Sequence, residues 1–501
     1  MTNIPVDNKV ILVCNIVEEL DLENLLSTCS KRGRKPVVDL LTMLKIVLFC
    51  YSERIYSTRD IEKFCKFDLR ARYILNGQHY PDHSTIDRFI LKLNDFAPDI
   101  LNQFVDMLIE TDHINMESIY IDGTKIESFA NKYTFVWRKS VEKNLEKLLV
   151  KVKIENNISP SCSLEDVVAI LRIHLKDAKR MADENSVEFV RGKGRRKTEL
   201  QKKIEYYEGK INKINEYLKH LEIMGERNSY SKTDHDATFM RMKEDHMLNG
   251  QLKPGYNIQY ASTGTFIVGV YGSQKANDLN TLIPLLDDML KDHSKYIKNI
   301  VCDAGYESEE NYTYLENHDL ESYIKPANYK ESKKKKASIG RRENMEYIPE
   351  KDAYKCANGK LLLREKDQTR GTRSGFVSRL YVYKCEECSG CGYSKECISS
   401  RFEDPKSKTI KYSPEYVRQR ERSLKNITSS HGIDLRVNRS IQAEGAFSYL
   451  KDGMRFRRFR HKGMKNVISQ MILMALGINV NRLMAKIKNN NFENIEYKAV
   501  A

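Results

Sequence analysis

The sequence predicts an α/β core that follows an all-α domain and is interrupted by two insertions, one helical and one rich in cysteine. Three observations support this fold class. Apolar segments with the length of β-strands end in an acid at 118–122 and at 299–303. The stretch 38–51 is apolar enough for a buried helix, and residues 200–221 carry a heptad pattern.

The composition favours a polyanionic partner. The chain has 501 residues and a formal net charge of +15. This charge is typical of proteins that bind nucleic acid, with an acidic membrane surface as the weaker choice. No apolar run approaches the roughly 18 residues of a membrane-spanning helix, and the N-terminus lacks the features of a signal peptide. We therefore expect a soluble, intracellular protein without a membrane partner.

Residues 1–105 are predicted to form the all-α domain. Segments 57–60 and 84–87 each place a side-chain acceptor three residues before an acid, which is the pattern of a capping box at a helix start. Short helices joined by short turns resemble a helix-turn-helix arrangement, and the segment 31–36 adds positive charge. This pattern predicts recognition of DNA ends. A helical packing or dimerisation domain is the alternative.

The α/β core is expected in two parts, 106–136 and 229–305. Segments 255–262 and 265–272 alternate like the paired strands of a hairpin, and 278–293 carries the apolar stripe of a helix. Each part of the core also contains one strand that ends in an acid. Such an acid can point into a cleft, although strands also end in Asp for reasons of turn geometry.

The first insertion, 137–228, is highly charged and is predicted to be helical. Its heptad seam spans three heptads, and the segment 141–154 suits an antiparallel partner. The seam consists of Leu200, Ile204, Tyr207, Ile211, Ile214, Leu218 and Leu221. We expect a helical hairpin within one chain, and an intermolecular coiled coil stays open as the alternative.

The second insertion, 306–432, contains five clustered cysteines. They are Cys356, Cys385, Cys388, Cys391 and Cys397. Two close thiolates on a turn, met by two more, suit a tetrahedral zinc ion, and five cysteines for four positions leave the ligand set open. An iron–sulfur cluster and reduced structural thiols are the alternatives. A site closed by four cysteines would stabilise the fold and leave no position for catalysis.

The C-terminal part, 433–488, is predicted to end in an apolar helix at 466–488, before a short tail at 489–501. Within it, residues 455–462 alternate basic and aromatic side chains, a pattern suited to a phosphate backbone and to stacked or flipped bases. The arginines of this basic stretch are Arg455, Arg457, Arg458 and Arg460.

Three acids stand out as candidate catalytic residues. Asp122 and Asp303 follow strands, and Glu444 lies on a helix. Three converging carboxylates can hold two Mg²⁺ or Mn²⁺ ions about 4 Å apart, and hard oxygen ligands suit these ions. Glu444 and Lys451 are seven residues apart, which places both on one face of an α-helix, while Phe447 can anchor that helix to a core.

The segment 231–246 is a competing metal constellation. Its candidate ligands are Asp234, His235, Asp236, Asp245 and His246. The alternative is a capped loop that leads into the hairpin, with Asp234 and Asp236 close to the proposed cleft.

On these residues the chain resembles the DDE transposases of bacterial insertion sequences, and is most similar to the eleven-eighty-two group. In the signature of related transposases a Lys follows the catalytic Glu by seven residues, as Lys451 follows Glu444. The Tyr and Arg positions of that signature fall on Val437 and Ser440, and Arg439, one place away, is a candidate DNA-binding residue. The resemblance rests on RKPVVDLLTML, PDHSTIDRF, YIDGTKIE, GQLKPGYNIQ, VCDAGYES, the cysteine-rich insertion and RSIQAEGAFSYLKDGMRFRRFRHKG.

The resemblance implies an RNase H-like catalytic core with Asp122, Asp303 and Glu444 as the triad and Lys451 on the backbone of the transposon end. It implies a cytoplasmic bacterial enzyme that binds terminal inverted repeats in double-stranded DNA. The enzyme would cleave the ends by metal-dependent hydrolysis and join the 3′-hydroxyls to target DNA. Because two ends must be held together, at least a homodimer is expected.

Two other functions compete with transposition. The first is a metal-dependent nuclease with an RNase H-like core that cuts DNA and never joins it. The second is a sequence-specific DNA-binding protein with an idle core. Transfer of a pre-cleaved end distinguishes transposition from both.

Overall fold

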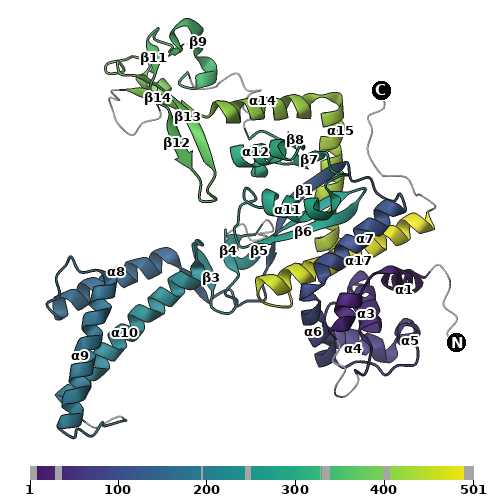
Figure 1. Ribbon diagram of the computed structural model, residues 1–501, viewed down its shortest axis with the longest axis horizontal. Helices are drawn as coiled ribbons and strands as arrows, with labels where there is room; N and C mark the ends of the chain where they lie inside the picture. Colours follow the sequence, from purple (N-terminus) through teal and green to yellow (C-terminus); the bar gives the residue numbers. More distant parts are fainter. Residues whose placement is uncertain are drawn as a thin grey trace.

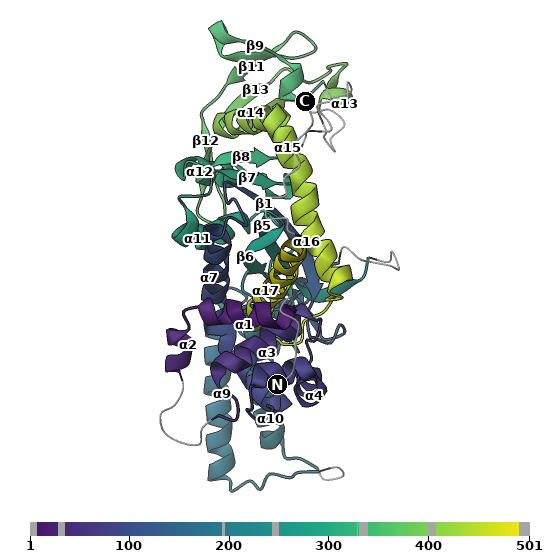
Figure 2. The same cartoon turned by 90° about the vertical axis from the view of Figure 1, so that its right-hand side faces the viewer.

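The computed structural model describes residues 8–28, 36–192, 196–242, 250–327, 329, 339–398 and 407–489. A mixed β-sheet forms its centre, with the N-terminal helices packed beside the C-terminal helix α17 (Figure 1). A bundle of long helices and a second, smaller sheet project from the centre toward opposite ends of the molecule (Figure 2).

The N-terminal domain is built around the helix α3. Its helices are α1 Lys9–Glu19, α2 Glu23–Ser27, α3 Leu40–Ser52, α4 Thr58–Phe67, α5 Leu69–Leu75, α6 His83–Lys92 and α7 Ala97–Glu110. α3 confirms the buried helix expected at 38–51, since every residue from Thr42 to Ser52 is buried. A helix that is apolar all round needs neighbours on every side, and α1, α5 and α17 are among those that supply them.

Two helix starts differ from the predicted capping boxes. The N-cap of α6 is Asp82, so this helix begins before the predicted start at residue 84. Ser57 is the N-cap of α4, but its side chain makes no capping hydrogen bond. Asp87, the acid of the second predicted box, contacts His461 at 2.9 Å instead. It thereby ties the N-terminal domain to the basic stretch.

The central sheet has the strand order β4-β5-β1-β7-β8, with β6 paired to β5. Its strands are β1 Ser118–Glu127, β4 Thr238–Arg241, β5 Leu252–Thr263, β6 Phe266–Ser273, β7 Asn299–Cys302 and β8 Glu321–Ile324. β1 is antiparallel to β5 and parallel to β7. β5 and β6 form the predicted hairpin, and its turn residues Gly264 and Thr265 both have positive φ.

The central sheet extends further than the sequence indicated. β1 does not end at Asp122 but continues to Glu127, because its second half pairs with β5. The sheet also continues beyond residue 305 through α12 (Glu309–Asn317) and β8. Conversely, α11 spans Leu282–His293 and begins four residues after the predicted start at 278.

Helices cover the two faces of the central sheet. On one face Tyr120 and Val301 pack with Ile427 and Leu435, which lie on α14 (Pro414–Thr428) and α15 (Ser430–Arg439). The opposite face packs against α11, where Gly269 of β6 faces Met289, whereas α17 lies on the other side of β6, where Gly272 faces Ile468. Side chains from distant parts of the chain thus fix the strand edges against two helical layers.

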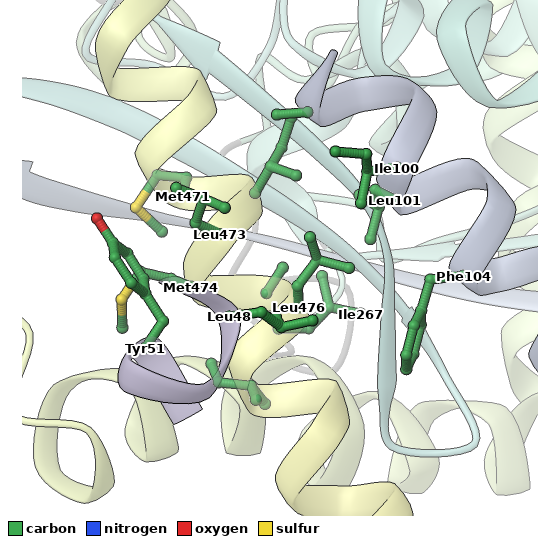
Figure 3. Close-up of a cluster of buried hydrophobic side chains, with 14 of the residues drawn as sticks. Leu48, Tyr51, Ile100, Leu101, Phe104, Ile267, Met471, Leu473, Met474 and Leu476 are labelled. Atoms are coloured by element: carbon green, nitrogen blue, oxygen red, sulfur yellow. The ribbon is translucent and has the colours of Figure 1, made fainter. Parts of the chain in front are cut away.

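The helix α17, Met464–Lys488, confirms the apolar helix predicted at 466–488. Figure 3 shows its side chains between the N-terminal helices and the sheet; the labelled members are Leu48, Tyr51, Ile100, Leu101, Phe104, Ile267, Met471, Leu473, Met474 and Leu476. α17 is long and apolar enough to cross a membrane, contrary to the expectation that no run approaches that length, but 83% of its most apolar window is buried. It therefore has the surroundings of a core helix.

The first insertion forms three helices rather than a hairpin: α8 Arg138–Glu155, α9 Leu164–Glu184 and α10 Glu199–Met224. The predicted seam on α10 faces both other helices, and Ile211 and Ile214 join a core cluster with residues of α8 and α9. The strands β2 (Phe135–Trp137) and β3 (Ser229–Ser231) pair at its base. Ile204, Ile211 and Ile214 of the seam are therefore buried within one chain, whereas Leu218 is exposed.

The second insertion forms a small antiparallel sheet with the order β12-β13-β11-β10-β9, and β14 pairs with β13. Its elements are β9 Glu346–Ile348, β10 Ala353–Lys355, β11 Leu361–Arg364, β12 Gln368–Gly371, β13 Val377–Cys385, α13 Ser394–Cys397 and β14 Lys408–Tyr412. This sheet has a core cluster of its own, which includes Tyr383 and Leu362.

Candidate active site

Asp122 lies on β1, and Asp303 directly follows the neighbouring parallel strand β7. The register pairs Tyr120 of β1 with Val301 of β7, and two residues further along each strand stand the two acids. Residues two apart on a strand share a face, so both acids lie on the face of Tyr120 and Val301. The buried Cys302 thiol reports this proximity: burial raises its pKa, and Asp303 and Asp122 raise it further.

Asp303 is positioned by the turn that follows β7. Its carboxylate oxygen Oδ1 accepts a hydrogen bond of 2.7 Å from the backbone amide of Gly305. A Cβ on Gly305 would lie 2.9 Å from that oxygen and 3.5 Å from Oδ2 of Asp278. The glycine therefore permits two carboxylates to approach the same turn.

Asp278 is a residue that the sequence interpretation missed. Its Oδ1 accepts hydrogen bonds from Asn257 at 2.7 Å and from Gln259 at 3.0 Å, both on β5. Tyr306, next to the same turn, donates to Gln259, and burial followed by Asp278 raises the pKa of this tyrosine. An acid ahead of an apolar helical stripe looks like part of that helix. Only the late start of α11 and the strand pairing bring it to the site.

Glu444 lies on a helical segment with an unusual hydrogen-bond pattern. Ser440–Glu444 and Tyr449–Gly453 are π-helical turns around the α-helical turn Gly445–Ser448. A π-turn brings residues five apart together, and such turns occur often at functional sites. Arg439 accordingly reaches Glu444, with Nη2 at 2.6 Å from Oε1. Arg439, one place from the Arg position of the signature, thus reaches Glu444 across the π-turn.

Glu444 pairs with Arg439 on a segment that contacts the same sheet as the two aspartates. The π-turn with Glu444 contacts β1 and β5, so it lies over the sheet near Asp122. Arg439 also lowers the pKa of Cys302, which places its guanidinium close to the strand ends. In the part of the chain that the structure describes, no group of three or more His, Cys, Asp or Glu side chains is arranged to hold a metal ion.

The anchor of this helical segment is as expected, but the aromatic residues of the basic stretch are not. Phe447 stacks on Tyr260 with centroids 4.8 Å apart. Phe456 and Phe459 are buried, with ring centroids 5.7 Å apart. They were expected to be available for stacking on bases. They belong to the core instead, where Phe459 also packs on Tyr256.

The basic side chains of the stretch differ in their contacts with the protein. Arg458 points back onto the protein, donating to the carbonyl oxygens of Ser128 and Ala130, and its backbone bridges to Glu127. The side chain of Arg457 donates to Asp452 at 3.0 Å. Arg455, Arg457 and Arg460 are exposed, while Lys451 is half-buried in a pocket beside β1.

The competing constellation at 231–246 has a structural role in its described residues. Asp234 is buried and accepts hydrogen bonds from Ser128 and Tyr256. Together with Asp236 it binds the backbone amides at the start of α17, at Gly463 and Met464. This favours the capped-loop alternative over a metal site. Asp245, His246 and most of the basic segment 31–36 lie outside the described residues.

The five clustered cysteines gather at one end of the smaller sheet. Burial raises the pKa of Cys388 to about 11, with Cys385 as the next cause. Burial also raises the pKa of Cys397, which Lys408 lowers. All five line one small cavity of about 20 Å³; they are Cys356, Cys385, Cys388, Cys391 and Cys397. The spacing thus predicted their proximity, although none of them forms a disulfide.

Two parts of the chain match known protein families. Residues 2–92 match the model described as Transposase domain (DUF772), and residues 355–484 match the model described as Transposase DDE domain. The second match includes Glu444 but neither Asp122 nor Asp303. No curated protein and no solved structure gives a significant match. The matches to its N-terminal domain and to its C-terminal part together support a DDE transposase of an insertion sequence.

Proposed function

We propose that this transposase cleaves the ends of its element and joins the freed 3′-hydroxyls to target DNA. The observation that carries the proposal is the register of β1 and β7, whose continuation by two residues reaches Asp122 on β1 and Asp303 directly after β7. The helical segment with Glu444 lies over the same sheet and in the region that matches the DDE domain. The mixed sheet between helical layers supports an RNase H-like core for this chemistry.

The three carboxylates fit a divalent metal by their chemistry. Asp122, Asp303 and Glu444 offer hard oxygen donors, which suit Mg²⁺ or Mn²⁺. Two bound ions would activate a water or a 3′-hydroxyl and stabilise the leaving oxygen. To contribute, Glu444 must exchange the guanidinium of Arg439 for the ion, and its half-exposed carboxylate leaves room for that exchange.

The DNA partners of the proposal are the terminal inverted repeats and the target duplex. We propose that the N-terminal domain recognises the repeats, and that Lys451, Arg455, Arg457 and Arg460 contact phosphates near the cleavage site. Arg439 and Arg458 are already engaged with protein groups. A homodimer would hold two ends together. We expect this dimer to be a soluble protein of the bacterial cytoplasm.

The proposal is tested on a labelled plasmid that carries the DNA flanking this gene, with Mg²⁺ or Mn²⁺. Asp303→Asn is the informative variant, because an amide oxygen still accepts the hydrogen bond from Gly305 while the charge is lost. Asp319→Asn, an exposed acid ahead of β8, is the matched control. We expect cleavage at the outer edges of the repeats by wild type and control only. Cleavage at arbitrary sites would favour the metal-dependent nuclease. Binding without cleavage would favour the DNA-binding protein with an idle core.

We further propose that the cysteine cluster binds a structural zinc ion. The shared cavity and the four to five available thiols support a closed site that stabilises the smaller sheet. Metal analysis of the purified chain should give one zinc per chain. Cys388→Ser should lower this zinc content, whereas the control Cys162→Ser should keep the zinc content of the wild type. Equal zinc content in Cys388→Ser and Cys162→Ser would contradict this assignment. A visible absorption band with bound iron would favour the iron–sulfur alternative.

A further inference from the structure

The strands β12 and β13 form a two-stranded ribbon that extends beyond the smaller sheet. β12 pairs with β13 between Val377 and Leu380, whereas β11 and β14 pair with β13 only from Tyr381 onward. Four residues of an extended strand span about 13 Å. Figure 1 shows this hairpin reaching from the smaller sheet toward the central sheet. We call residues 368–380 the β12–β13 ribbon.

The β12–β13 ribbon is held at both of its ends. At its tip, the hydroxyl of Ser374 donates to Glu310 of α12 at 2.8 Å. At its base, the carboxylate of Asp367 accepts hydrogen bonds from Arg364 at 2.5 Å and from Arg379 at 2.8 Å. A two-stranded hairpin is only marginally stable in water by itself. These contacts therefore fix the direction in which the ribbon projects.

The surface of the β12–β13 ribbon is exposed and basic. Every residue of β12 is exposed, and the ribbon contains three arginines and no acidic residue. Arg370 is paired with Ser378 across the ribbon, and Arg379 is paired with Thr369. Paired residues share a face and successive residues alternate, so Arg370 and Arg379 lie on opposite faces. Arg373 lies in the turn that joins the strands. Positive charge is therefore present on both faces and at the tip.

A groove of duplex DNA matches the shape and the charge of the ribbon. The major groove is about 12 Å wide and about 8.5 Å deep, and it admits a two-stranded β-ribbon. Phosphates line both of its walls, so arginines on two faces can each meet one wall. An exposed edge strand such as β12 can also pair with a second copy of the chain. Three arginines without an acid oppose that pairing, because like charges would face each other.

We propose that the β12–β13 ribbon enters the major groove of the element end and contacts its phosphates. The contacting residues are Arg370, Arg373 and Arg379. The tip rests on α12, which begins six residues after Asp303, so the ribbon places the duplex close to the candidate active site. This inference rests on the proposed function. It assigns DNA binding to the second insertion, where the cysteine cluster alone indicates a structural role.

The first test measures binding of the full chain to an inverted-repeat duplex at several salt concentrations. Arg370→Gln and Arg373→Gln should each weaken binding and reduce the slope of log affinity against log salt by about one. Arg422→Gln, which removes an exposed arginine of α14, is the matched control and should leave the slope unchanged. Unchanged slopes in both ribbon variants would overturn the inference.

The second test is photo-crosslinking from p-benzoylphenylalanine placed at Val377, whose side chain is 60% exposed on the ribbon. The same group at Leu363, which is 54% exposed on β11, is the matched control. We expect a crosslink to the inverted-repeat duplex from the ribbon position and none from the control. A crosslink between two copies of the chain would show that β12 pairs with a second protomer and would overturn the inference, as would the lack of any DNA crosslink.

Cleavage by the wild type separates the failure of this inference from the failure of the proposed function. If the wild type cuts at the repeat ends while the ribbon variants bind and crosslink as the controls do, only the role of the ribbon is overturned. A wild type that neither binds nor cleaves the duplex would overturn the proposed function as well.

Discussion

Glu444 differs from the other two candidate acids in its surroundings. Asp122 and Asp303 are set by strand register, but the Glu444 carboxylate is engaged with Arg439 at 2.6 Å. That contact depends on a π-turn, which turns a spacing of five residues into a side-chain contact. In the proposed function, a bound metal ion and the Arg439 guanidinium would compete for this carboxylate.

This competition predicts the effect of Arg439→Gln. Removing the guanidinium should tighten Mn²⁺ binding by about two- to fivefold, since a partly exposed ion pair contributes at most about 1 kcal/mol. Titration calorimetry of the full chain measures this affinity directly. Arg422→Gln, which removes an exposed arginine of α14, is the control. Unchanged or weaker Mn²⁺ binding in Arg439→Gln would show that the ion pair does not compete with the metal.

Asp278 provides a second prediction at this scale. Asp278→Ala removes the acceptor of the Gln259 side-chain amide and leaves that of Asn257 only the carbonyl of Asn277, so it should lower the free energy of unfolding by about 1–3 kcal/mol. Asp278→Asn keeps an oxygen acceptor and should lose less. Urea unfolding of the two variants compares them. Equal stability of Asp278→Ala and wild type would mean that these hydrogen bonds do not hold the turn.

Among the secondary-structure elements, the basic stretch shows where pattern and packing diverge. Alternating basic and aromatic residues indicate nucleic-acid binding when both kinds are exposed. Here the backbone of Arg458 bridges to Glu127 at the end of β1, which holds the stretch against the protein. Phe456 and Phe459 consequently enter the core, while Arg455 and Arg457 face solvent. The sequence alone does not show which side of the pattern is covered.

This burial predicts that two substitutions of Phe459 lower the stability of the protein by different amounts. Phe459→Leu should cost less than about 1.5 kcal/mol and leave DNA affinity unchanged, because the volume is nearly kept. Phe459→Ala should cost about 3–5 kcal/mol by leaving a cavity. Thermal unfolding and DNA binding are measured on the same preparations. A loss of DNA affinity in Phe459→Leu at unchanged stability would instead support base stacking by this ring.

Local patterns predicted the elements that local sequence specifies. α3, the β5–β6 hairpin, the strand before Asp303 and α17 each follow from periodicity or composition within one segment. The missed features depend on partners far along the chain. β1 continues past Asp122 because β5 pairs with it, and Asp278 reaches the site because Asn257 and Gln259 hold it. The middle helix of the first insertion, α9, was likewise not predicted as a separate helix, because the whole segment is highly charged.

Across the whole molecule, the long helices form a unit that joins the core through a narrow base. The backbone amide of Arg138 donates to the carbonyl of Asn228 at 2.9 Å, so the two ends of the insertion are adjacent. The apolar clusters of the bundle are separate from the main core. The smaller sheet also has its own cluster. The central sheet and the N-terminal domain share the main core, which α17 completes.

This organisation predicts that the helical bundle can be removed without unfolding the core. Replacing residues 139–227 with a short Gly-Ser linker should leave a soluble protein with one cooperative unfolding transition for the remaining core. Circular dichroism during thermal unfolding is the measurement. Replacing residues 470–480 of α17 in the same way is the matched control and should abolish the transition. An aggregated or non-cooperative product after removal of the bundle would contradict the separation of the two units.

The central claim is that Asp122, Asp303 and Glu444 act as one site on DNA. The most direct measurement is cleavage of labelled inverted-repeat DNA in Mg²⁺ by Glu444→Gln beside wild type, with Glu421→Gln on α14 as an exposed control. The claim predicts cleavage by wild type and control, and no product from Glu444→Gln, although this variant still binds the DNA. Cleavage by Glu444→Gln at the wild-type rate would contradict the claim.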